Sequence, residues 1–272
     1  MKTFIRWAGN KTRYINEILP HIPSYSRYIE PFVGSGSLFL FLQPHSWLIN
    51  DKNKDIINLW KHIKSDVNVL ATNVNGFMNK FYRADDKLTF CKKMTETFPK
   101  LSNTYQRSAM YLALKNLVYM GFLVVNGKYN FGSMEFNYYK PNYKPSFVSD
   151  RYKQNLHSVS TFMNETKGLI KNKDYKDILA ATKPGDFVFL DPPYIEEHKY
   201  NFSYGDSESC EGFLKELLAE CKKLDAKGIL WLMTQANTPA VRELFKGYKM
   251  KKFKVYRGTN HEIKYELIVK NY

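Results

Sequence analysis

The sequence predicts an α/β fold, a doubly wound and mostly parallel sheet with a mainly helical insertion that carries a β-hairpin. Short apolar segments alternate with helical patterns in residues 1–55 and 165–272. Residues 56–164 break this alternation with a mainly helical pattern. They hold 15 Lys and Arg against 6 Asp and Glu, a denser positive charge than in the rest of the chain. We therefore predict one α/β domain in two pieces, 1–55 and 165–272, around a basic inserted domain at 56–164.

Seven segments of the α/β part are predicted as strands, because apolar or β-prone residues there run up to a polar residue, a glycine or a proline. The first leads into Gly34-Ser35-Gly36 and an apolar run from Leu38 that predicts a helix start. A helical stretch at 211–224 precedes the fifth. The predicted strands are 28–32, 46–50, 168–170, 186–190, 227–234, 250–256 and 264–270.

The insertion contains two local signals. Apolar residues at helical spacing predict a helix near 104–119, with Ala109, Leu112 and Ala113 on its face. Further on, Asn126-Gly127 separates two β-prone runs. Because this dipeptide is the strongest short hairpin signal in a sequence, we predict a hairpin at 123–131.

The 272-residue chain carries a formal net charge of +15, which favours a polyanionic partner, nucleic acid before an acidic membrane. No apolar run approaches the length of a membrane span, and the N-terminus lacks the apolar core of a signal peptide. The three cysteines and six histidines show no metal-ligand spacing. These features predict an intracellular, cytoplasmic protein with reduced thiols and no bound metal.

The glycine turn and the residue that ends the second strand point to a cofactor. Gly34 and Gly36 allow a tight turn and a close approach of the backbone to a ligand, although the third glycine of a dinucleotide site is missing. Asp51 follows the second strand, where an acid can accept hydrogen bonds from ribose hydroxyls. Each feature alone is common in turns and loops, but together they favour a cofactor that contains adenosine.

The most specific motif is Asp191-Pro192-Pro193-Tyr194, directly after the apolar strand 186–190. Two prolines fix φ and remove two backbone donors, so this corner is rigid and rich in acceptors. A carboxylate and an adjacent peptide carbonyl match the two N–H groups of an exocyclic amine. Accepting both would draw an adenine amine towards tetrahedral geometry and free its lone pair, while Tyr194 stacks on the base. The alternative is a turn that only ends a strand.

With these motifs the chain resembles the Dam-like group of DNA adenine-N6 methyltransferases (D12 class, α-group). In this group the cofactor motif precedes the target-recognition segment and the catalytic motif follows it. Asn10 departs from the group, which usually has a second glycine there; Asn tolerates positive φ, so we expect a small effect. The matching residues are Trp7-Ala8-Gly9-Asn10-Lys11, Glu30-Pro31-Phe32-Val33-Gly34-Ser35-Gly36-Ser37, Asp51, Asp174-Tyr175 and Asp191-Pro192-Pro193-Tyr194.

The resemblance implies a Rossmann-like methyltransferase fold with S-adenosylmethionine as the cofactor. It also implies a catalytic corner made of Asp191, Pro192, Pro193 and Tyr194, in which Asp191 touches both the cofactor and the target amine. The residues that it implies for the cofactor site are Trp7, Lys11, Phe32, Gly34, Gly36, Ser37, Asp51, Asp174, Tyr175 and Asp191.

The resemblance further implies double-stranded DNA as the partner, with the target adenine flipped out of the duplex. The basic insertion would supply phosphate contacts, for which Arg83, Arg107 and Arg151 are candidates. Residues 195–205 are expected to form a mobile loop over the base. The hairpin residues with suitable groups for contacts to DNA are Asn126, Lys128, Tyr129 and Asn130.

Three other interpretations stay open. The same chemistry could act on RNA or on a protein amide, although the related NPPY form is common there. A silent DNA-binding relative would be expected to have lost some of Gly34, Gly36, Asp51 and Asp191, which are all present. A nucleotide-binding dehydrogenase would lack DPPY. From the group we also expect a monomer or weak dimer; a GATC-like target, a partner restriction nuclease and a phage or viral origin stay open.

Overall fold

The chain is divided by its internal contacts into two compact units, which we describe separately. Unit 1 contains residues 1–12, 34–43 and 53–170, and unit 2 contains residues 13–33, 44–52 and 171–272. The domain boundaries predicted from the sequence remain a prediction. The computed structural model describes residues 1–7, 9–102, 104–117, 124–125, 128–129, 149–194, 210–257 and 262–272.

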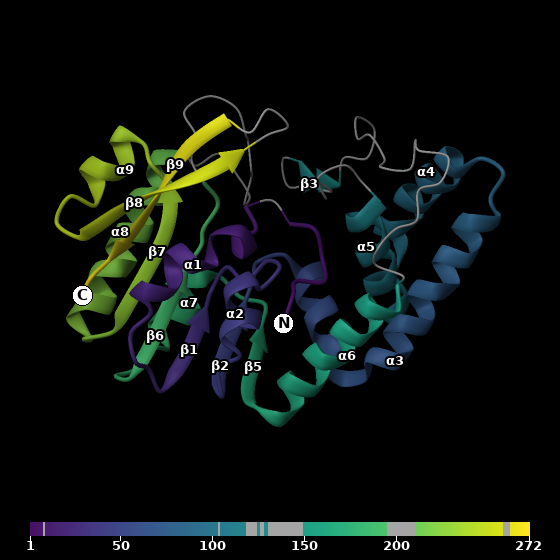
Figure 1. The fold of residues 1–272 in the computed structure, drawn as a ribbon, viewed down its shortest axis with the longest axis horizontal. Coiled ribbons are helices and arrows are strands. Elements are labelled where there is room, and N and C mark those ends of the chain that lie inside the picture. Colours follow the sequence, from purple (N-terminus) through teal and green to yellow (C-terminus); the bar gives the residue numbers. More distant parts are fainter. Residues whose placement is uncertain are drawn as a thin grey trace. The chain divides into compact units, whose positions relative to one another are not determined.

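A seven-stranded, mostly parallel sheet confirms the predicted α/β fold. Its strands are β1 (Arg27–Glu30), β2 (Ser46–Asn50), β5 (Lys167–Lys171), β6 (Asp186–Leu190), β7 (Leu230–Ala236), β8 (Lys249–Arg257) and β9 (Glu262–Lys270). They lie in the order β5-β2-β1-β6-β7-β9-β8 (Figure 1). β1 is parallel to β2 and β6, and β6 is parallel to β7. β9 is antiparallel to β7 and β8, so the sheet ends in a hairpin.

Helices of unit 2 cover one face of this sheet. A single apolar core joins Leu217 of α8 and Val241 of α9 to Val188 and Trp231 of the central strands. All five residues of β6 are buried, as expected for a parallel strand in the middle of a sheet. The helices and turns of unit 2 are α1 (Ile15–Ile18), η2 (Leu19–His21), α7 (Tyr175–Ala180), α8 (Cys210–Ala226) and α9 (Pro239–Leu244).

Unit 1 is mainly helical. Its helices and turns are α2 (Ser37–Leu42), α3 (Lys54–Arg83), α4 (Lys87–Thr97), η3 (Phe98–Lys100), α5 (Tyr105–Leu117) and α6 (Asp150–Glu165), and η1 (Lys11–Tyr14) leads from it into unit 2. α3 packs against α5 and α6. Trp60 of α3 is fully buried, with ring centroids 4.7 Å from Phe4 and 5.8 Å from Phe39. This aromatic cluster ties the N-terminal segment and α2 to α3.

α3 is kinked at Asp66, whose backbone is extended (φ −159°, ψ 93°). The Asp66 carboxylate accepts hydrogen bonds from the backbone N–H groups of Asn68 (3.0 Å) and Val69 (3.1 Å). An aspartate in this position caps the N-terminus of a helix. Asp66 therefore ends the first half of α3 and caps the second.

All seven predicted strands are found. Those at 46–50 and 186–190 have the predicted bounds, and the other five differ by one to three residues at one or both ends. The first strand ends at Glu30 instead of residue 32, because Pro31 has no N–H with which to continue the ladder. The fifth begins at Leu230 instead of residue 227. Gly228 has a left-handed backbone (φ 67°) that ends α8, so the chain becomes extended only after it.

The predicted hairpin is confirmed by two short antiparallel strands, β3 (Val124–Val125) and β4 (Lys128–Tyr129). Val124 pairs with Tyr129, and Val125 pairs with Lys128. Asn126, Gly127 and Asn130 lie outside the described residues, as do the side chains of Lys128 and Tyr129. The part of the helix prediction at 118–119 and the expected loop at 195–205 also lie outside them.

Cys91 and Cys221 are buried free thiols, as predicted, and the Cys210 side chain lies outside the described residues. Burial raises the pKa of the Cys91 thiol to about 12, so it stays protonated at neutral pH. Among the described helices, none is long and apolar enough to cross a membrane.

Arg107 was a predicted phosphate ligand, and the structure corrects this prediction. Its guanidinium is buried in unit 1 and forms a salt bridge with Asp55 at 2.6 Å. It also donates to the carbonyls of Phe98 (2.8 Å) and Leu101 (2.7 Å). These hydrogen bonds engage the guanidinium N–H groups of Arg107 inside the fold, so Arg107 has a structural role and is not a phosphate ligand. Arg83 and Arg151, by contrast, are exposed.

Removing Arg107 should destabilise the protein strongly. We expect Arg107→Ala to lower the free energy of unfolding by about 3–5 kcal/mol, because Asp55 would become an unpaired buried charge. Urea unfolding measures this change. The exposed Arg151→Ala is the matched control and should change stability by no more than about 0.5 kcal/mol. Equal stability of the two variants would contradict a structural role for the Asp55–Arg107 pair.

Candidate active site

The predicted catalytic and acidic residues of unit 2 lie at one edge of its sheet. β1, β2, β6 and β7 run in parallel, with Glu30 opposite Ile49 and Leu190 opposite Met233. The carboxyl ends of these strands therefore reach the same edge. Asp51 follows β2 and Asp191 follows β6. In open α/β sheets, ligands bind at this edge.

Side chains from β7 hold the Asp191-Pro192-Pro193-Tyr194 corner from within the sheet. The hydroxyl of Thr234 donates to Asp191 Oδ1 at 2.7 Å, and the amide of Gln235 donates to the Pro193 carbonyl at 3.4 Å. Thr234 and Gln235 are fully buried. Within the described residues, no donor to the Pro192 carbonyl is found. The corner thus presents a fixed carboxylate and a peptide carbonyl next to each other in the chain.

Tyr194 is held by β9. Its hydroxyl donates to Glu266 Oε2 at 2.7 Å, and the Glu266 side chain is buried. Burial raises the pKa of Tyr194 well above its usual value, and the charges of Asp191 and Glu266 raise it further. Tyr194 is therefore a neutral phenol, and its O–H group donates a hydrogen bond to Glu266. This hydrogen bond fixes the orientation of the Tyr194 ring and therefore which ring face is available for stacking.

Asn50, the last residue of β2, joins two loops at the same edge. Its Nδ2 group donates to the carbonyls of Pro31 (3.0 Å) and Lys173 (3.1 Å), and its Oδ1 accepts from the Lys173 N–H (2.9 Å). The Asn50 carbonyl also accepts from the Val33 N–H at 2.8 Å. Asn50 is almost completely buried. It therefore fixes the segment after β1 against the segment before α7.

Four other predicted residues of unit 2 lie in these segments. Phe32 and Tyr175 pack together with ring centroids 5.1 Å apart. Asp51 is 1% exposed, and its carbonyl accepts from the Asn172 amide at 2.7 Å. Asp174 is exposed and caps α7 by accepting from the Lys176 N–H at 2.9 Å. Phe32 and Tyr175 can thus form an apolar surface for a ligand, and Asp51 can supply an acid. Asp174 already has a structural role as the cap of α7.

The glycine turn belongs to unit 1 and requires glycine. Gly34 has φ 43°, and a Cβ atom there would lie 2.5 Å from Nε1 of Trp7. Its carbonyl accepts from Nε1 of Trp60 at 3.1 Å. Gly36 has φ 65° and directly precedes α2, which begins at Ser37. Two tryptophans therefore contact the turn at Gly34, where there is no room for a side chain.

Asn10 stabilises this turn through its side chain. Its Nδ2 group donates to Ser35 Oγ at 3.3 Å, and its Oδ1 accepts from Ser37 Oγ at 3.0 Å. The positive φ of the segment belongs to Gly9 (75°), and Asn10 does not have a positive φ. The sequence argument that Asn10 is tolerated for its backbone was therefore wrong. The asparagine instead links the N-terminal motif to both serines.

Two buried lysines lie in the N-terminal motif and on α5. Lys11 is 3% exposed and donates to the Gly9 carbonyl at 2.7 Å. Lys115 is 7% exposed, and its ammonium lies 4.5 Å from the centroid of the Trp7 ring. This distance is within the range of a cation–π interaction. Unit 1 therefore holds two lysines close to the N-terminal segment, whose Trp7 packs on the glycine turn.

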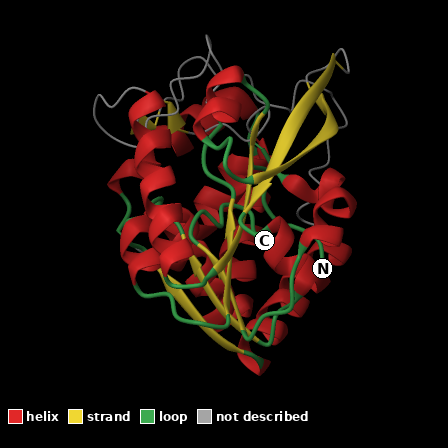
Figure 2. Cartoon of the chain, turned by 90° about the vertical axis from the view of Figure 1, so that its left-hand side faces the viewer, coloured by secondary structure: helices red, strands yellow, loops and turns green. Residues whose placement is uncertain are grey.

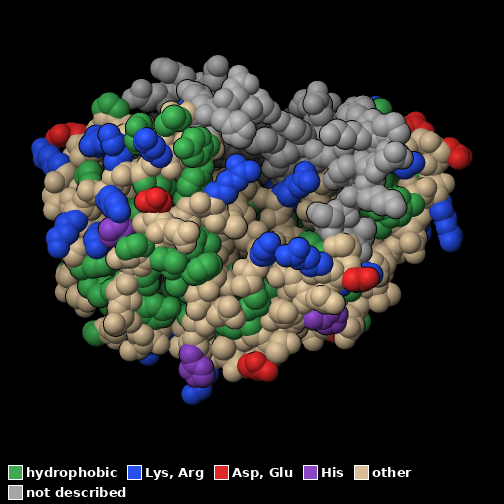
Figure 3. All heavy atoms as spheres, viewed as in Figure 1, with side chains coloured by type: hydrophobic (Ala, Val, Ile, Leu, Met, Phe, Trp, Pro, Cys, Tyr) green, Lys and Arg blue, Asp and Glu red, His purple; other side chains and the backbone are tan. Residues whose placement is uncertain are grey.

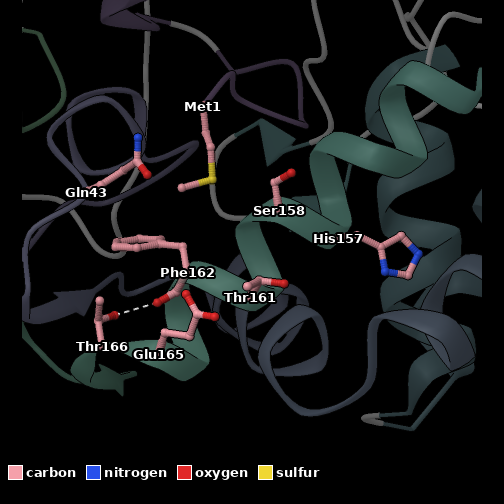
Figure 4. Close-up of a pocket in the computed structure, with 8 residues that line it drawn as sticks. All are labelled: Met1, Gln43, His157, Ser158, Thr161, Phe162, Glu165 and Thr166. Carbon is pink, nitrogen blue, oxygen red and sulfur yellow. Dashed lines mark hydrogen bonds between the residues drawn. The ribbon is translucent and has the colours of Figure 1, made fainter.

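A shallow hollow of about 430 Å³ lies on α6 and contains none of the predicted site residues (Figure 4). Its lining includes Met1, Gln43 and His157, and Thr166 donates to the Phe162 carbonyl at 2.7 Å on its floor. No convergent set of acceptors comparable to the Asp191 corner is found among these lining residues.

Comparison with known proteins decides the class. The model of the D12 class N6 adenine-specific DNA methyltransferases matches residues 7–259, nearly the whole chain. The chain belongs to this family. The predicted function is thus confirmed: this methyltransferase acts on adenine N6 in DNA.

Relatives of the methyltransferase carry names of the same kind. The Type II methyltransferase M1.LlaDCHI of Lactococcus lactis is 28% identical over 293 residues, covering 100% of this chain and 96% of its own. The Type II methyltransferase M.MjaIII of Methanocaldococcus jannaschii is 29% identical, covering 100% and 99%. The DNA adenine methylase of Haemophilus influenzae is 27% identical, covering 95% and 88%.

Five structurally important residues of the methyltransferase were not predicted from the sequence. Thr234 and Gln235 carried a usable signal, because two polar residues continue a buried apolar strand at its carboxyl end. Glu266 is a lone acid among apolar residues, which is a weaker signal of the same kind. Asn50 and Lys115 gave none, because their partners lie far away in the chain. The complete set is Asn50, Lys115, Thr234, Gln235 and Glu266.

A side chain at Gly34 should disrupt the turn. We expect Gly34→Ala to destabilise the methyltransferase by about 1–3 kcal/mol, because its positive φ is strained for alanine and the Cβ would contact Trp7. Methyl transfer should fall as well. The thermal unfolding midpoint and the transfer rate measure the two effects.

Gly76 provides the matched control. It lies within α3, and a Cβ there would meet nothing within 4 Å. Gly76→Ala should raise stability by about 0.5–1 kcal/mol, because alanine is the better helix former. A Gly34→Ala variant as stable and active as Gly76→Ala would show that the turn does not need glycine.

Proposed function

We propose that the chain methylates a flipped-out adenine in duplex DNA, with S-adenosylmethionine as methyl donor and Asp191, Pro192, Pro193 and Tyr194 as the catalytic corner. The observation that carries this proposal is the fixed corner after β6, where Thr234 binds Asp191 and Glu266 binds Tyr194. The family match supports the reaction, and the corner supports the assignment of residues.

The corner has acceptors for both N–H groups of the adenine amine. Thr234 donates to Asp191 Oδ1, and a carboxylate has about four acceptor sites, so it can accept from more than one donor at once. Gln235 occupies the Pro193 carbonyl, which favours the Pro192 carbonyl as the second acceptor. Two accepted hydrogen bonds localise the nitrogen lone pair, and Asp191 stabilises the positive charge that develops on nitrogen. Tyr194, a neutral phenol, would stack on the base.

The residues proposed for the cofactor fit the parts of S-adenosylmethionine. When bound, this cofactor supplies a methyl group on a positively charged sulfur. Gly34 and Gly36 form a tight turn at positive φ before α2, which suits a bound cofactor, and the buried Asp51 carboxylate suits ribose hydroxyls. Lys11 carries a buried cation that suits a carboxylate. The proposed set is Trp7, Lys11, Phe32, Gly34, Gly36, Ser37, Asp51, Asp174, Tyr175 and Asp191.

Base flipping requires the protein to hold the duplex while one nucleotide leaves the stack, at a cost of a few kcal/mol. We propose that the insertion at 56–164 contributes phosphate contacts, since it holds 15 Lys and Arg against 6 acids. Its confirmed hairpin has a size and polarity suited to a major groove. The residues proposed for DNA contacts there are Asn126, Lys128, Tyr129 and Asn130.

We also propose that the enzyme works inside the cell, where its DNA substrate is, as a monomer or weak dimer. The name Type II methyltransferase of two relatives supports a partner restriction nuclease as its biological setting.

Asp191 should be essential for transfer. We expect Asp191→Ala to lower the rate of methyl transfer by at least about 10²–10³-fold, because the amine loses a charged acceptor. Transfer of labelled methyl from S-adenosylmethionine to unmethylated duplex DNA, with single-stranded DNA and RNA alongside, measures this loss. Unfolding and DNA binding should remain as in the unchanged protein. Survival of the activity would refute the assigned corner.

Lys128 should affect sequence preference if it recognises a base. We expect Lys128→Ala to relax the preference at one base pair while the salt dependence of binding stays the same. Sequencing of the methylated sites and binding across a salt series measure the two effects. An unchanged preference with a shallower salt slope would make Lys128 a phosphate contact.

A further inference from the structure

The C-terminal hairpin, residues 249–272, accounts for most of the net positive charge outside the insertion. Residues 249–272 hold seven Lys and Arg against two Glu, a net charge of +5, whereas all residues outside 56–164 together have +6. Figure 3 shows blue basic side chains next to green apolar ones in the region that β8 and β9 occupy in Figure 1. The positive net charge outside the insertion is therefore local and needs a local explanation.

The β8–β9 ladder continues beyond the rest of the sheet. The pairing of β9 with β7 ends at Glu266 opposite Ala236. The pairing of β9 with β8 continues to Glu262 opposite Arg257. Figure 2 shows the two strands projecting together past the other strands. This two-stranded extension starts at the carboxyl end of β7, the edge at which Asp191 also lies.

One face of the extension combines lysines with large apolar side chains. Strand alternation buries Phe253 and Val255 on the other side of β8. Lys252 lies on the same side of β8, one residue before the extension begins, and continues its face. The extension face, with Lys252 included, comprises Lys252 and Lys254, which are exposed, and Tyr256, Ile263 and Tyr265, which are 49%, 54% and 38% exposed.

Cross-strand pairs organise this face. Lys254 lies opposite Tyr265, and Tyr256 lies opposite Ile263. The Lys252 ammonium lies 4.5 Å from the centroid of the Tyr265 ring. Within the part of the chain that the structure describes, no ion pair of Lys252 or Lys254 with an acid is found. Both cations are therefore available to an anionic partner.

The extension is anchored at both ends of its described part. The Tyr14 hydroxyl donates to the Tyr256 carbonyl at 3.1 Å and accepts from the Tyr256 N–H at 2.7 Å. One phenol thus satisfies both backbone groups of the edge strand at Tyr256. At the other end, Glu266 accepts from Tyr194 at 2.7 Å. A surface beside the catalytic corner is thereby held in a defined position relative to that corner.

We propose that the extension face binds the phosphate backbone of duplex DNA, as a contact surface of unit 2 separate from the insertion. Lysine ammonium groups pair with phosphates, and tyrosine hydroxyls donate to phosphate oxygens without reading sequence. The proposal rests on the proposed function in one respect: an adenine that enters at Asp191 brings its duplex to this edge of the sheet.

The chemistry of the face favours DNA over a second copy of the chain. A symmetric contact would bring the lysines of one copy against the lysines of the other. Three partly exposed apolar side chains also give much less area than the ~800 Å² that each partner buries in a typical stable complex. A polyanion, in contrast, would be attracted by both lysines at once.

The test is the salt dependence of DNA binding, measured by fluorescence anisotropy with a labelled non-specific duplex and no methyl donor. We expect Lys252→Gln with Lys254→Gln to make the slope of log K against log salt shallower by about 1.8, since each lost phosphate contact contributes ~0.9. The affinity at fixed low salt should fall several-fold. Because the assay involves no transfer, a wrong assignment of Asp191 would leave its result unaffected.

Lys183→Gln with Lys222→Gln is the matched control, because it removes the same charge from exposed positions of unit 2 outside the hairpin. The control should keep the slope of the unchanged protein. Equal slopes for the two double variants would overturn the proposal. It would also be overturned if Tyr256→Ser with Ile263→Ser abolished self-association in sedimentation velocity while the lysine variant left the slope unchanged, since the face would then bind protein.

Discussion

The buried side chain of Asn50 is the constraint on which the site edge of unit 2 depends. A buried backbone carbonyl without a partner costs about 1–3 kcal/mol. The Pro31 carbonyl after β1 is buried, and the Lys173 carbonyl before α7 is partly buried. One amide serves them, because Asn combines two N–H donors with an acceptor. It binds Pro31 and both backbone groups of Lys173. The packing of Phe32 on Tyr175 follows from this connection, because each ring lies next to a segment that Asn50 holds.

The same requirement explains the catalytic corner. Consecutive prolines cannot join a ladder as donors, so the chain after β6 leaves the sheet with its carbonyls and the Asp191 carboxylate in need of partners. β7 supplies them from buried positions, Thr234 and Gln235, where apolar residues would otherwise be expected. Burying these polar side chains is acceptable only because each is hydrogen-bonded. Buried side chains of the sheet therefore orient the corner through hydrogen bonds. The corner itself can then contact the substrate.

A feature could be predicted from the sequence when the residues that determine it are close together in the chain. The strands at 46–50 and 186–190 were predicted to the residue, because each apolar run meets a residue that ends it. The start of β7 was missed, since the pattern KGILWLMT does not show that Gly228 takes a left-handed backbone. Arg107 was misjudged because its partner, Asp55, lies 52 residues earlier. A guanidinium looks the same in a sequence whether it meets phosphate or a buried carboxylate.

Asn10 and the C-terminal hairpin show a third case, in which the sequence argument considered one part of a residue or of the charge and left another part out. Asn10 was assessed by its backbone, whereas its effect comes from a side chain that binds two serines more than 20 residues away. The net charge was assigned chiefly to the insertion, yet strand alternation that buries Phe253 and Val255 necessarily exposes Lys252 and Lys254 together. Chemistry on one amine needs a small site, but holding a duplex open around it needs phosphate contacts over a wider surface. The extension of the C-terminal hairpin begins at Glu266, which accepts a hydrogen bond from Tyr194. It therefore lies beside the small site and can also add phosphate contacts to the wider surface.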